Sequence, residues 1–194
     1  MKRKLLTIIS LTLLFTGMSF GAPQKGTMKD PRDGKTYKTV KIGKQVWMAE
    51  NMNYDIKHSY CYDAVPGYCE KYGRLYTWEA ALNVCPEGWH LPTNEEFETL
   101  KSNVGGDEYS AKLLKSATGW REGNGIDKYG FNAIPAGHYG NNAFGSAGTL
   151  AFFWSATEDY ERVAYEFVLD GYNKNAYLIR NVKVNANSVR CLQD

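Results

Sequence analysis

Residues 85–100 read CPEGWHLPTNEEFETL and hold side chains of the types that enzymes use for acid–base or nucleophilic chemistry. They include Cys85, His90, Glu95 and Glu96. A histidine beside a carboxylate can move a proton, and a free cysteine can act as a nucleophile. Whether this stretch does chemistry depends on the elements that position these residues.

The second half of the stretch has the pattern of a helix start. Thr93 stands three residues before Glu96, which is the spacing of a capping box. Phe97, Leu100 and Val104 continue one apolar helical face, and a glycine pair then ends the helix. The two glutamates of the first turn therefore have a structural role, because the helix dipole favours negative charge there. As general acid–base candidates they are weak, since no partner stands at a fixed spacing.

Other catalytic patterns are not found in the sequence. There is no H-E-x-x-H, phosphate-binding loop or dinucleotide fingerprint, and FGSAG at 144–148 is not a nucleophile elbow. His58, His90 and His138 are scattered, and His90 is expected in or just below the core. We therefore expect no catalytic residue, no metal site and no cofactor.

The four cysteines Cys61, Cys69, Cys85 and Cys191 allow three disulfide pairings. A Pro-Gly turn between Cys61 and Cys69 favours their local pairing, which leaves Cys85 with Cys191. The longer link closes a loop of about 100 residues, worth roughly 4–5 kcal/mol in the chain-entropy model. A zinc site using His58 and Cys61 is the alternative, but the paired, closely spaced ligands of structural zinc are missing.

The N-terminus has the organisation of a secretory signal peptide. Three basic residues precede an apolar run at 5–16, and small residues favour cleavage after Gly21. The alternative is an uncleaved signal anchor. We expect residues 1–21 to be the signal peptide, 22–34 a mobile leader and 35–194 one domain. The protein would then be secreted, at the cell surface or in the periplasm, with no transmembrane segment after cleavage.

Charge excludes one class of partner. The chain has 23 Lys and Arg and 21 Asp and Glu. The signal peptide carries three of the bases and no acids, so the mature part has 20 against 21, or −1. No block of like charge remains, and we expect no nucleic-acid binding.

The pattern of elements predicts an α+β fold. Gly43-Lys44 separates two strand-like runs and predicts a hairpin over 36–42 and 45–49. Helical spacing predicts further helices over 74–85 and 108–116. Predicted C-terminal strands span 131–134, 149–155, 162–169, 175–180 and 187–192. Helices between a hairpin and a set of strands indicate an antiparallel sheet whose terminal strands pair.

Aromatic residues offer a binding surface. The chain has 14 Tyr, 8 Phe and 5 Trp, and the loop HYGNNAFGSAG at 138–148 combines aromatic rings with Asn and Gly. Flat rings bury area at low entropy cost, which suits contact with carbohydrate or protein. We predict His138, Tyr139, Asn141 and Asn142 as ligand-binding residues.

Six ordered segments carry a family resemblance. IGKQVWMAENMNYD, YGRLYTWEAA, CPEGWHLPTNEEFETL, GFNAIPAG, FWSATE and SVRC resemble the Fibrobacter succinogenes major paralogous domain family over residues 30–194. The resemblance implies an exported bacterial protein from a large paralogous set whose biochemical role is not established.

LPTNEEFETL and the terminal VRC are also similar to parts of formylglycine-generating-enzyme-type domains, a branch of the C-type lectin-like fold. This similarity implies two main helices packed on a curled antiparallel sheet. Activity is not implied, because those enzymes use a cysteine pair shortly before the final strand and residues 140–190 contain no cysteine. The E-P-N, Q-P-D and W-N-D motifs of calcium-dependent lectins are also not found.

These observations favour a secreted or cell-surface, non-enzymatic binding module. Its expected partner is a glycan or another envelope protein, contacted through the aromatic and Asn-rich loops. The alternatives are an oxidase of the formylglycine-generating type, which needs a free cysteine pair, and a structural envelope component without a small ligand.

Overall fold

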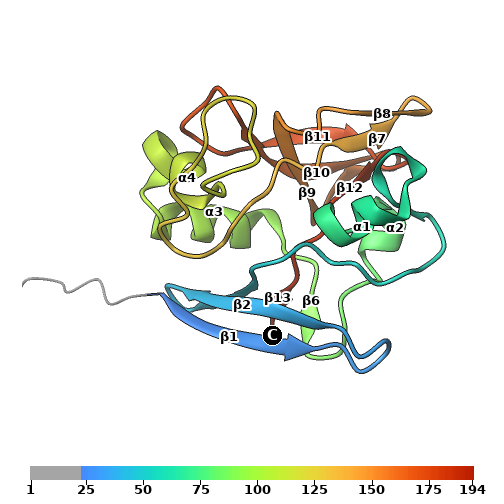
Figure 1. Cartoon of the computed structure of the whole chain (residues 1–194), viewed down its shortest axis with the longest axis horizontal. Helices are drawn as coiled ribbons and strands as arrows, with labels where there is room; N and C mark the ends of the chain where they lie inside the picture. The colour runs from blue at the N-terminus through green and yellow to red at the C-terminus, as the bar shows by residue number, and fades with distance from the viewer. Residues whose placement is uncertain (1–22) are drawn as a thin grey trace, which may run out of the picture.

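Antiparallel strands dominate the computed structural model, which describes residues 23–194 (Figure 1). The predicted signal peptide, residues 1–21, lies outside the described residues. The strands form three sheets, and every pairing between two named strands is antiparallel. The predicted mixture of a few helices with antiparallel sheet is confirmed.

The first sheet contains the predicted hairpin and has the strand order β1-β2-β3-β13-β6. Its strands are β1 (Gln24–Lys29), β2 (Thr36–Ile42), β3 (Gln45–Met48), β6 (Trp89–His90) and β13 (Leu192–Gln193). Gly43 has the positive φ of 61° that the short turn between β2 and β3 needs. Val40 and Trp47 are opposite each other in this hairpin, and both are buried in the core.

The C-terminal strand closes the domain, as the sequence predicts. Leu192 of β13 pairs with Trp47 of β3 on one side and with His90 of β6 on the other. The preceding residue, Cys191, is bonded to Cys85, and its carbonyl accepts the N–H of Met48 at 3.0 Å. Residues from both ends of the domain therefore share one sheet.

Two further sheets complete the structure. The second, in the order β11-β10-β9, contains β9 (Leu150–Tyr160), β10 (Val163–Asp170) and β11 (Tyr177–Val182). The third, in the order β4-β5-β12-β7-β8, contains β4 (Ser59–Tyr60), β5 (Leu75–Thr77), β7 (His138–Gly140), β8 (Ala143–Gly145) and β12 (Ala186–Asn187).

Strand β9 lies between two apolar cores. Successive side chains of a strand point to opposite faces, so Phe153 belongs to one core and Trp154 to the other. The first core includes Phe97 of helix α3 (Asn94–Asn103), and the Phe97 ring stacks on Phe167 of β10 at a centroid distance of 4.6 Å. In the second core, the indole N–H of Trp154 donates to the carbonyl of Tyr76 at 2.7 Å, so its polar group is satisfied.

Helices α3 (Asn94–Asn103) and α4 (Gly106–Leu114) pack beside the sheets, and α3 begins at the predicted capping box. The Thr93 hydroxyl accepts the N–H of Glu96 at 3.3 Å, and the Glu96 carboxylate accepts the N–H of Thr93 at 2.8 Å. The shorter helices are η1 (Tyr62–Ala64), α1 (Pro66–Tyr72) and α2 (Trp78–Ala81). Helix α4 begins two residues before its predicted start at 108.

The predicted helix over 74–85 is wrong in its first half. Residues 75–77 form strand β5, and only Trp78–Ala81 are α-helical. Tyr76 pairs with Ser59 of β4 and with Asn187 of β12. Hydrogen bonding to a strand on each side outweighs the helical spacing of the apolar residues in this segment.

Two predicted strands also differ from the structure. Residues 131–134 are irregular apart from one parallel bridge between Lys115 and Ala133. The predicted strand 187–192 is divided between β12 and β13, which belong to different sheets. The chain changes sheets at residues 188–191, where the Arg190 side chain is buried and bonded to backbone carbonyls.

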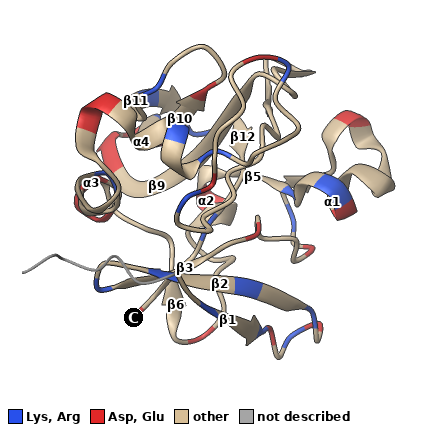
Figure 2. Ribbon diagram, turned by 60° about the vertical axis from the view of Figure 1, so that its left-hand side comes forward, with Lys and Arg blue, Asp and Glu red and all other residues tan. Residues whose placement is uncertain are grey.

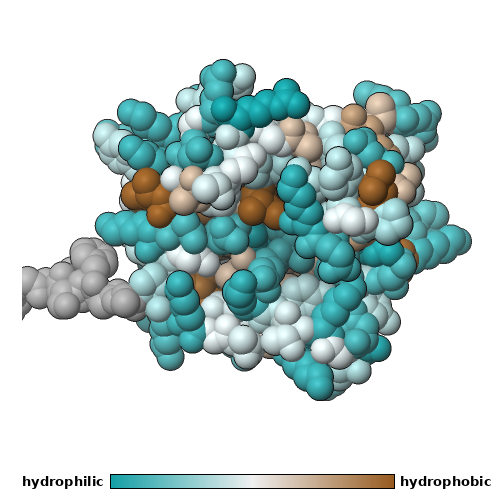
Figure 3. Space-filling view, in the orientation of Figure 1, coloured by the Kyte–Doolittle hydropathy of each residue, from teal (hydrophilic) through white to brown (hydrophobic). Residues whose placement is uncertain are grey.

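Charges of both signs are spread over the whole ribbon (Figure 2). The face in Figure 3 is mostly hydrophilic, with apolar side chains in small separate groups. Among residues 23–194, no helix is long and apolar enough to cross a membrane.

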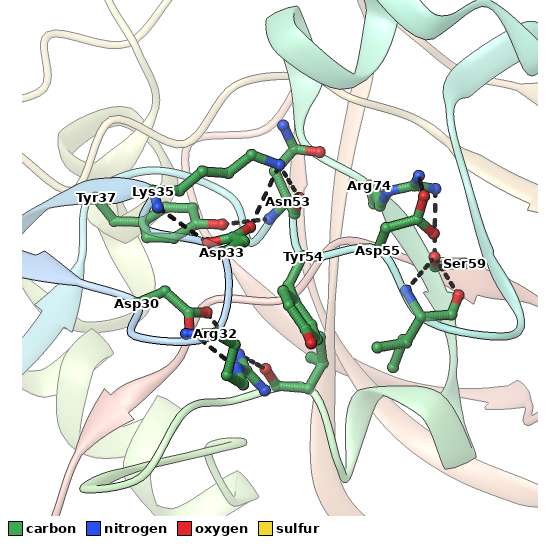
Figure 4. A network of polar contacts seen from close by, with 12 residues as sticks. Asp30, Arg32, Asp33, Lys35, Tyr37, Asn53, Tyr54, Asp55, Ser59 and Arg74 are labelled. Atoms are coloured by element: carbon green, nitrogen blue, oxygen red, sulfur yellow. Dashed lines mark hydrogen bonds and ion pairs between the residues drawn. The ribbon is translucent and has the colours of Figure 1, made fainter.

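The expectation of a mobile leader at 22–34 differs from the structure, in which Gln24–Lys29 form β1 against β2. The following turn is held by Asp30 and Arg32 (Figure 4). Two guanidinium nitrogens of Arg32 donate to the Asp30 carboxylate at 2.7 and 2.9 Å, and Arg32 also donates to the carbonyl of Val84 at 2.7 Å. The segment is polar because β1 is an edge strand with Met28 as its buried side chain, so its composition resembles that of a loop.

Candidate functional site

The predicted ligand-binding residues lie on one hairpin, formed by β7 and β8. Tyr139 is opposite Phe144, and Asn141 and Asn142 form the turn. Both asparagines have positive φ, 51° and 59°, which a two-residue turn of this type requires. The two asparagines are therefore needed for the backbone turn, and their side chains are exposed at its tip.

His138 points toward the interior. Its ring meets Phe152 of β9 edge-on at a centroid distance of 5.1 Å, and its Nδ1 is buried without a hydrogen-bond partner among the described residues. Burial lowers the pKa of His138, so the ring is neutral at physiological pH. Of the four predicted residues, Tyr139 is the one whose ring joins a larger group of aromatic side chains.

That group, here called the tyrosine cluster, gathers rings from two distant parts of the chain. The Tyr139 ring lies 4.9 Å from Tyr60 and 4.8 Å from Phe144, and Phe144 lies 5.3 Å from Tyr62. Tyr62 in turn contacts the two tyrosines of helix α1 at 6.0 and 6.1 Å. The members, all partly exposed, are Tyr60, Tyr62, Tyr68, Tyr72, Tyr139 and Phe144.

A disulfide and a sheet position the cluster. Cys61 and Cys69 are bonded, which confirms the predicted local pairing and closes the segment that carries Tyr62 and Tyr68. Strand β12 pairs with β5 on one side and with β7 on the other, and this brings the β4 segment to the β7–β8 hairpin. Neither connection is local, so the aromatic side chains gather only in the folded protein.

The hydroxyl of Tyr62 and an adjoining hollow add polar groups to the cluster. Burial raises the pKa of Tyr62, so its hydroxyl stays protonated and can both donate and accept hydrogen bonds. A hollow of about 270 Å³ adjoins Tyr60 and is also lined by Thr77, Glu79 and Lys183. The site thus combines flat apolar rings with hydroxyl, carboxylate and ammonium groups, which is the mixture that polar cyclic ligands require.

His90, inside the stretch 85–100, forms a second polar arrangement. Its Nε2 lies 3.0 Å from Glu96 and its Nδ1 lies 2.6 Å from Asp194. Burial alone would lower the pKa of His90, but the hydrogen bonds to Asp194 and Glu96 raise it overall. Because Glu96 also caps α3 through Thr93, these contacts connect the helix to the C-terminal strand, and the stretch is architectural. The sequence gives no sign of Asp194 as a partner, since it lies 104 residues from His90.

All four cysteines are paired in disulfides, in the preferred one of the three pairings. Across residues 23–194, no group of three His, Cys, Asp or Glu side chains is placed to hold a metal ion.

Comparison with known proteins identifies the family. Searches of curated proteins and of solved structures find no match. The family model described as the Fibrobacter succinogenes major domain matches residues 40–193, from β2 to β13, a range that holds the first core, most of the second and the tyrosine cluster. The chain therefore belongs to the Fibrobacter succinogenes major domain family.

Proposed function

We propose that this protein is an exported, non-enzymatic binding module and that the tyrosine cluster is its contact surface for a glycan. The observation that carries the proposal is the gathering of six partly exposed rings on one corner of the fold. Two disulfides support export, because such bonds persist in oxidising compartments.

The physical basis is the surface that tyrosine offers. Its ring supplies a flat apolar face for the C–H groups of a sugar, and its hydroxyl can hydrogen-bond the sugar's oxygens. The Cys61–Cys69 bond holds Tyr62 and Tyr68 in place before a ligand arrives, so less conformational entropy is lost on binding. The hollow beside Tyr60 adds charged and hydroxyl groups at the edge of the rings.

Two other functions are alternatives to this one. An oxidase of the formylglycine-generating type needs a free cysteine pair, and here the four cysteines are bonded to one another. A contact surface for an envelope protein would use the same rings, since tyrosine is enriched in protein interfaces. The experiment must therefore offer both kinds of partner.

The test compares tyrosines inside and outside the cluster. Tyr60→Ala and Tyr139→Ala remove rings from it, whereas Tyr160→Ala and Tyr172→Ala remove rings that are 60% and 69% exposed elsewhere. Binding is measured on a glycan array and by capture from an envelope-protein extract. We expect glycan binding that falls at least tenfold in the cluster variants and is unchanged in the controls. Equal loss in all four variants, or capture of a protein with no glycan bound, would overturn the proposal.

We also infer that the domain has a C-type lectin-like fold. The inference is supported by the pairing of β13 with β3 and by the disulfide that joins Cys191 to the segment before α3. An experimental structure, compared with lectin-like domains by superposition, tests it. Absence of a common sheet topology would contradict it.

A further inference from the structure

A polar cleft of about 340 Å³ adjoins the tyrosine cluster and shares Tyr72 with it. It lies between the start of β2, the C-terminal end of α1 and the segment 132–134, and Arg190 is part of its lining. Its volume is at the lower end of the roughly 300–1,000 Å³ typical of small-ligand sites. The cleft is therefore large enough for one small polar molecule or one residue of a larger one.

Arg190 places a buried positive charge beside this cleft. Its Nε donates to Asn51 at 2.6 Å, its Nη1 to the carbonyls of Met48 and Phe131, and its Nη2 to the carbonyl of Asn132 at 2.9 Å. A guanidinium has five N–H groups, so four are used and one on Nη2 remains. All four hydrogen-bond acceptors are neutral groups, and the carboxylates of Glu50 and Asp127 attract the guanidinium without a hydrogen bond to it. Burial lowers the pKa of Arg190 to about 9, which leaves it protonated at neutral pH.

The walls of the cleft supply amide groups that other parts of the protein do not use. The side-chain amides of Asn53 and Asn132 make no hydrogen bond to another described residue, and each can donate and accept. The backbone of Asn53 is held at both of its polar groups (Figure 4). Lys35 donates to the Asn53 carbonyl at 2.6 Å, and the Asn53 N–H donates to the hydroxyl of Tyr37 at 3.1 Å. The backbone that presents the Asn53 amide is thus held in place without using the amide itself.

The charges at the rim favour an anionic group. Lys71 lies on α1 with its Nζ 4.7 Å from the centre of the Tyr72 ring. Three cationic side chains line the cleft, Lys35, Lys71 and Arg190, against two glutamates. Glu50 is paired with Lys38 at 3.2 Å and also attracts Arg190. A carboxylate would form charge-assisted hydrogen bonds with these cationic donors. The amides suit hydroxyl groups, and the ring of Tyr72 suits the apolar face of a sugar.

We propose that this cleft binds an acidic saccharide residue, with its carboxylate at Arg190 and Lys71 and its hydroxyls at Asn53 and Asn132. The proposal rests on the proposed function and deepens it by naming the class of glycan. The rings of the tyrosine cluster then bind the neighbouring sugars of the same chain, and Tyr72 lies between the two sites.

The test uses titration calorimetry with the trisaccharide of galacturonic acid and with the neutral trisaccharide of galactose. Arg190 is avoided because its loss would disturb the fold. Asn132→Gly removes an amide where the φ of 53° suits glycine. Asn53→Ala removes the second amide, and Asn103→Ala makes the same change at an exposed residue of α3 outside the cleft. We expect the acidic trisaccharide to bind at least tenfold more tightly than the neutral one. Asn132→Gly and Asn53→Ala should weaken its binding at least tenfold, and Asn103→Ala should not.

Three results would overturn the cleft proposal: no binding of the acidic trisaccharide, equal binding by the two cleft variants and wild type, or equal affinity for acetate. The experiment distinguishes failure of the cleft proposal from failure of the tyrosine-cluster proposal. If Tyr139→Ala loses glycan binding and Asn132→Gly keeps it, the tyrosine cluster stands and the cleft proposal is wrong. If Asn132→Gly loses binding and Tyr139→Ala keeps it, the cleft stands and the assignment of the tyrosine cluster is wrong.

Discussion

Glu166 is a carboxyl group inside the protein, on the central strand β10. It is 2% exposed, and it accepts hydrogen bonds from the amides of Asn181 and Asn187. Burial raises its pKa to about 7, and the two hydrogen bonds lower the pKa by less than burial raises it. No cation forms an ion pair with it among the described residues, so the folded protein favours the protonated, neutral form of this side chain.

Glu166→Gln should therefore stabilise the protein above neutral pH. The folded-state pKa lies above the unfolded value of 4.5, so its contribution is fully present below pH 4.5 and is lost as pH rises through about 7. The shift corresponds to about 3 kcal/mol. Urea unfolding at pH 5 and pH 8 should show similar stabilities at pH 5 and a variant more stable by about 2–3 kcal/mol at pH 8. A variant that loses as much stability as wild type between these pH values would refute this assignment.

Arg190→Lys should strongly destabilise the protein. Lysine has one ammonium group and cannot reach the acceptors that Arg190 bonds on Asn51, Met48, Phe131 and Asn132. Buried acceptors left without donors cost about 1–3 kcal/mol each, so we expect a loss of about 3 kcal/mol or more in urea unfolding. Arg162→Lys, at an exposed position, is the control and should change stability by less than about 0.5 kcal/mol.

At the scale of the element, helix α3 depends on its cap. Thr93→Ala removes the hydroxyl that accepts the N–H of Glu96 and should cost about 1 kcal/mol. Thr99→Ala makes the same change inside α3, where the hydroxyl donates to the carbonyl of Glu95 on an exposed face. Alanine is the better helix former, so this control should be neutral or slightly stabilising. Chemical denaturation of both variants measures the difference, and equal effects would contradict the role of the cap.

The same helix shows which elements sequence can predict. The cap, the apolar face and the stop of α3 all lie within about three turns, and the β2–β3 hairpin likewise depends on a local turn. β1 pairs along its whole length with the neighbouring β2, but as an edge strand with one buried side chain it lacks an alternating apolar pattern. β5 is held by β4 and by the distant β12, a pairing that no local pattern reveals. Their sequences alone indicate a loop and a helix.

The candidate site, too, could be predicted from the sequence only in part. Tyr139 is predicted from the composition of its own hairpin, whereas Tyr60 and Tyr62 join it through sheet pairings that no local pattern reveals. One signal was present: four tyrosines stand in or beside the Cys61–Cys69 segment. The Arg190 cleft has no such signal in the sequence, because its lining comes from five separate stretches of the chain.

At the scale of the whole molecule, the two disulfides constrain very different lengths of chain. Cys85–Cys191 spans 106 positions and connects the C-terminal strand to the start of the α3 region, whereas Cys61–Cys69 spans eight. Cross-links that close longer loops remove more entropy from the unfolded chain. The long bond belongs to the buried sheet, and the short one to the surface that carries the tyrosine cluster.

Removing each bond should therefore have a different consequence. Replacing Cys85 and Cys191 by Ala should cost about 4–5 kcal/mol, and replacing Cys61 and Cys69 about 2–3 kcal/mol, by the loop-closure term. Urea unfolding measures both, and equal losses would contradict the loop-length explanation.

Glycan binding should respond in the opposite order at temperatures where both variants are folded. Without Cys61–Cys69, the segment that carries Tyr62 and Tyr68 is no longer closed by a disulfide. This variant should bind more weakly, because ordering the segment on binding costs conformational entropy. The variant without Cys85–Cys191 should bind as wild type does, since neither cysteine lies in the segments 60–72 and 138–145 that carry the rings of the cluster.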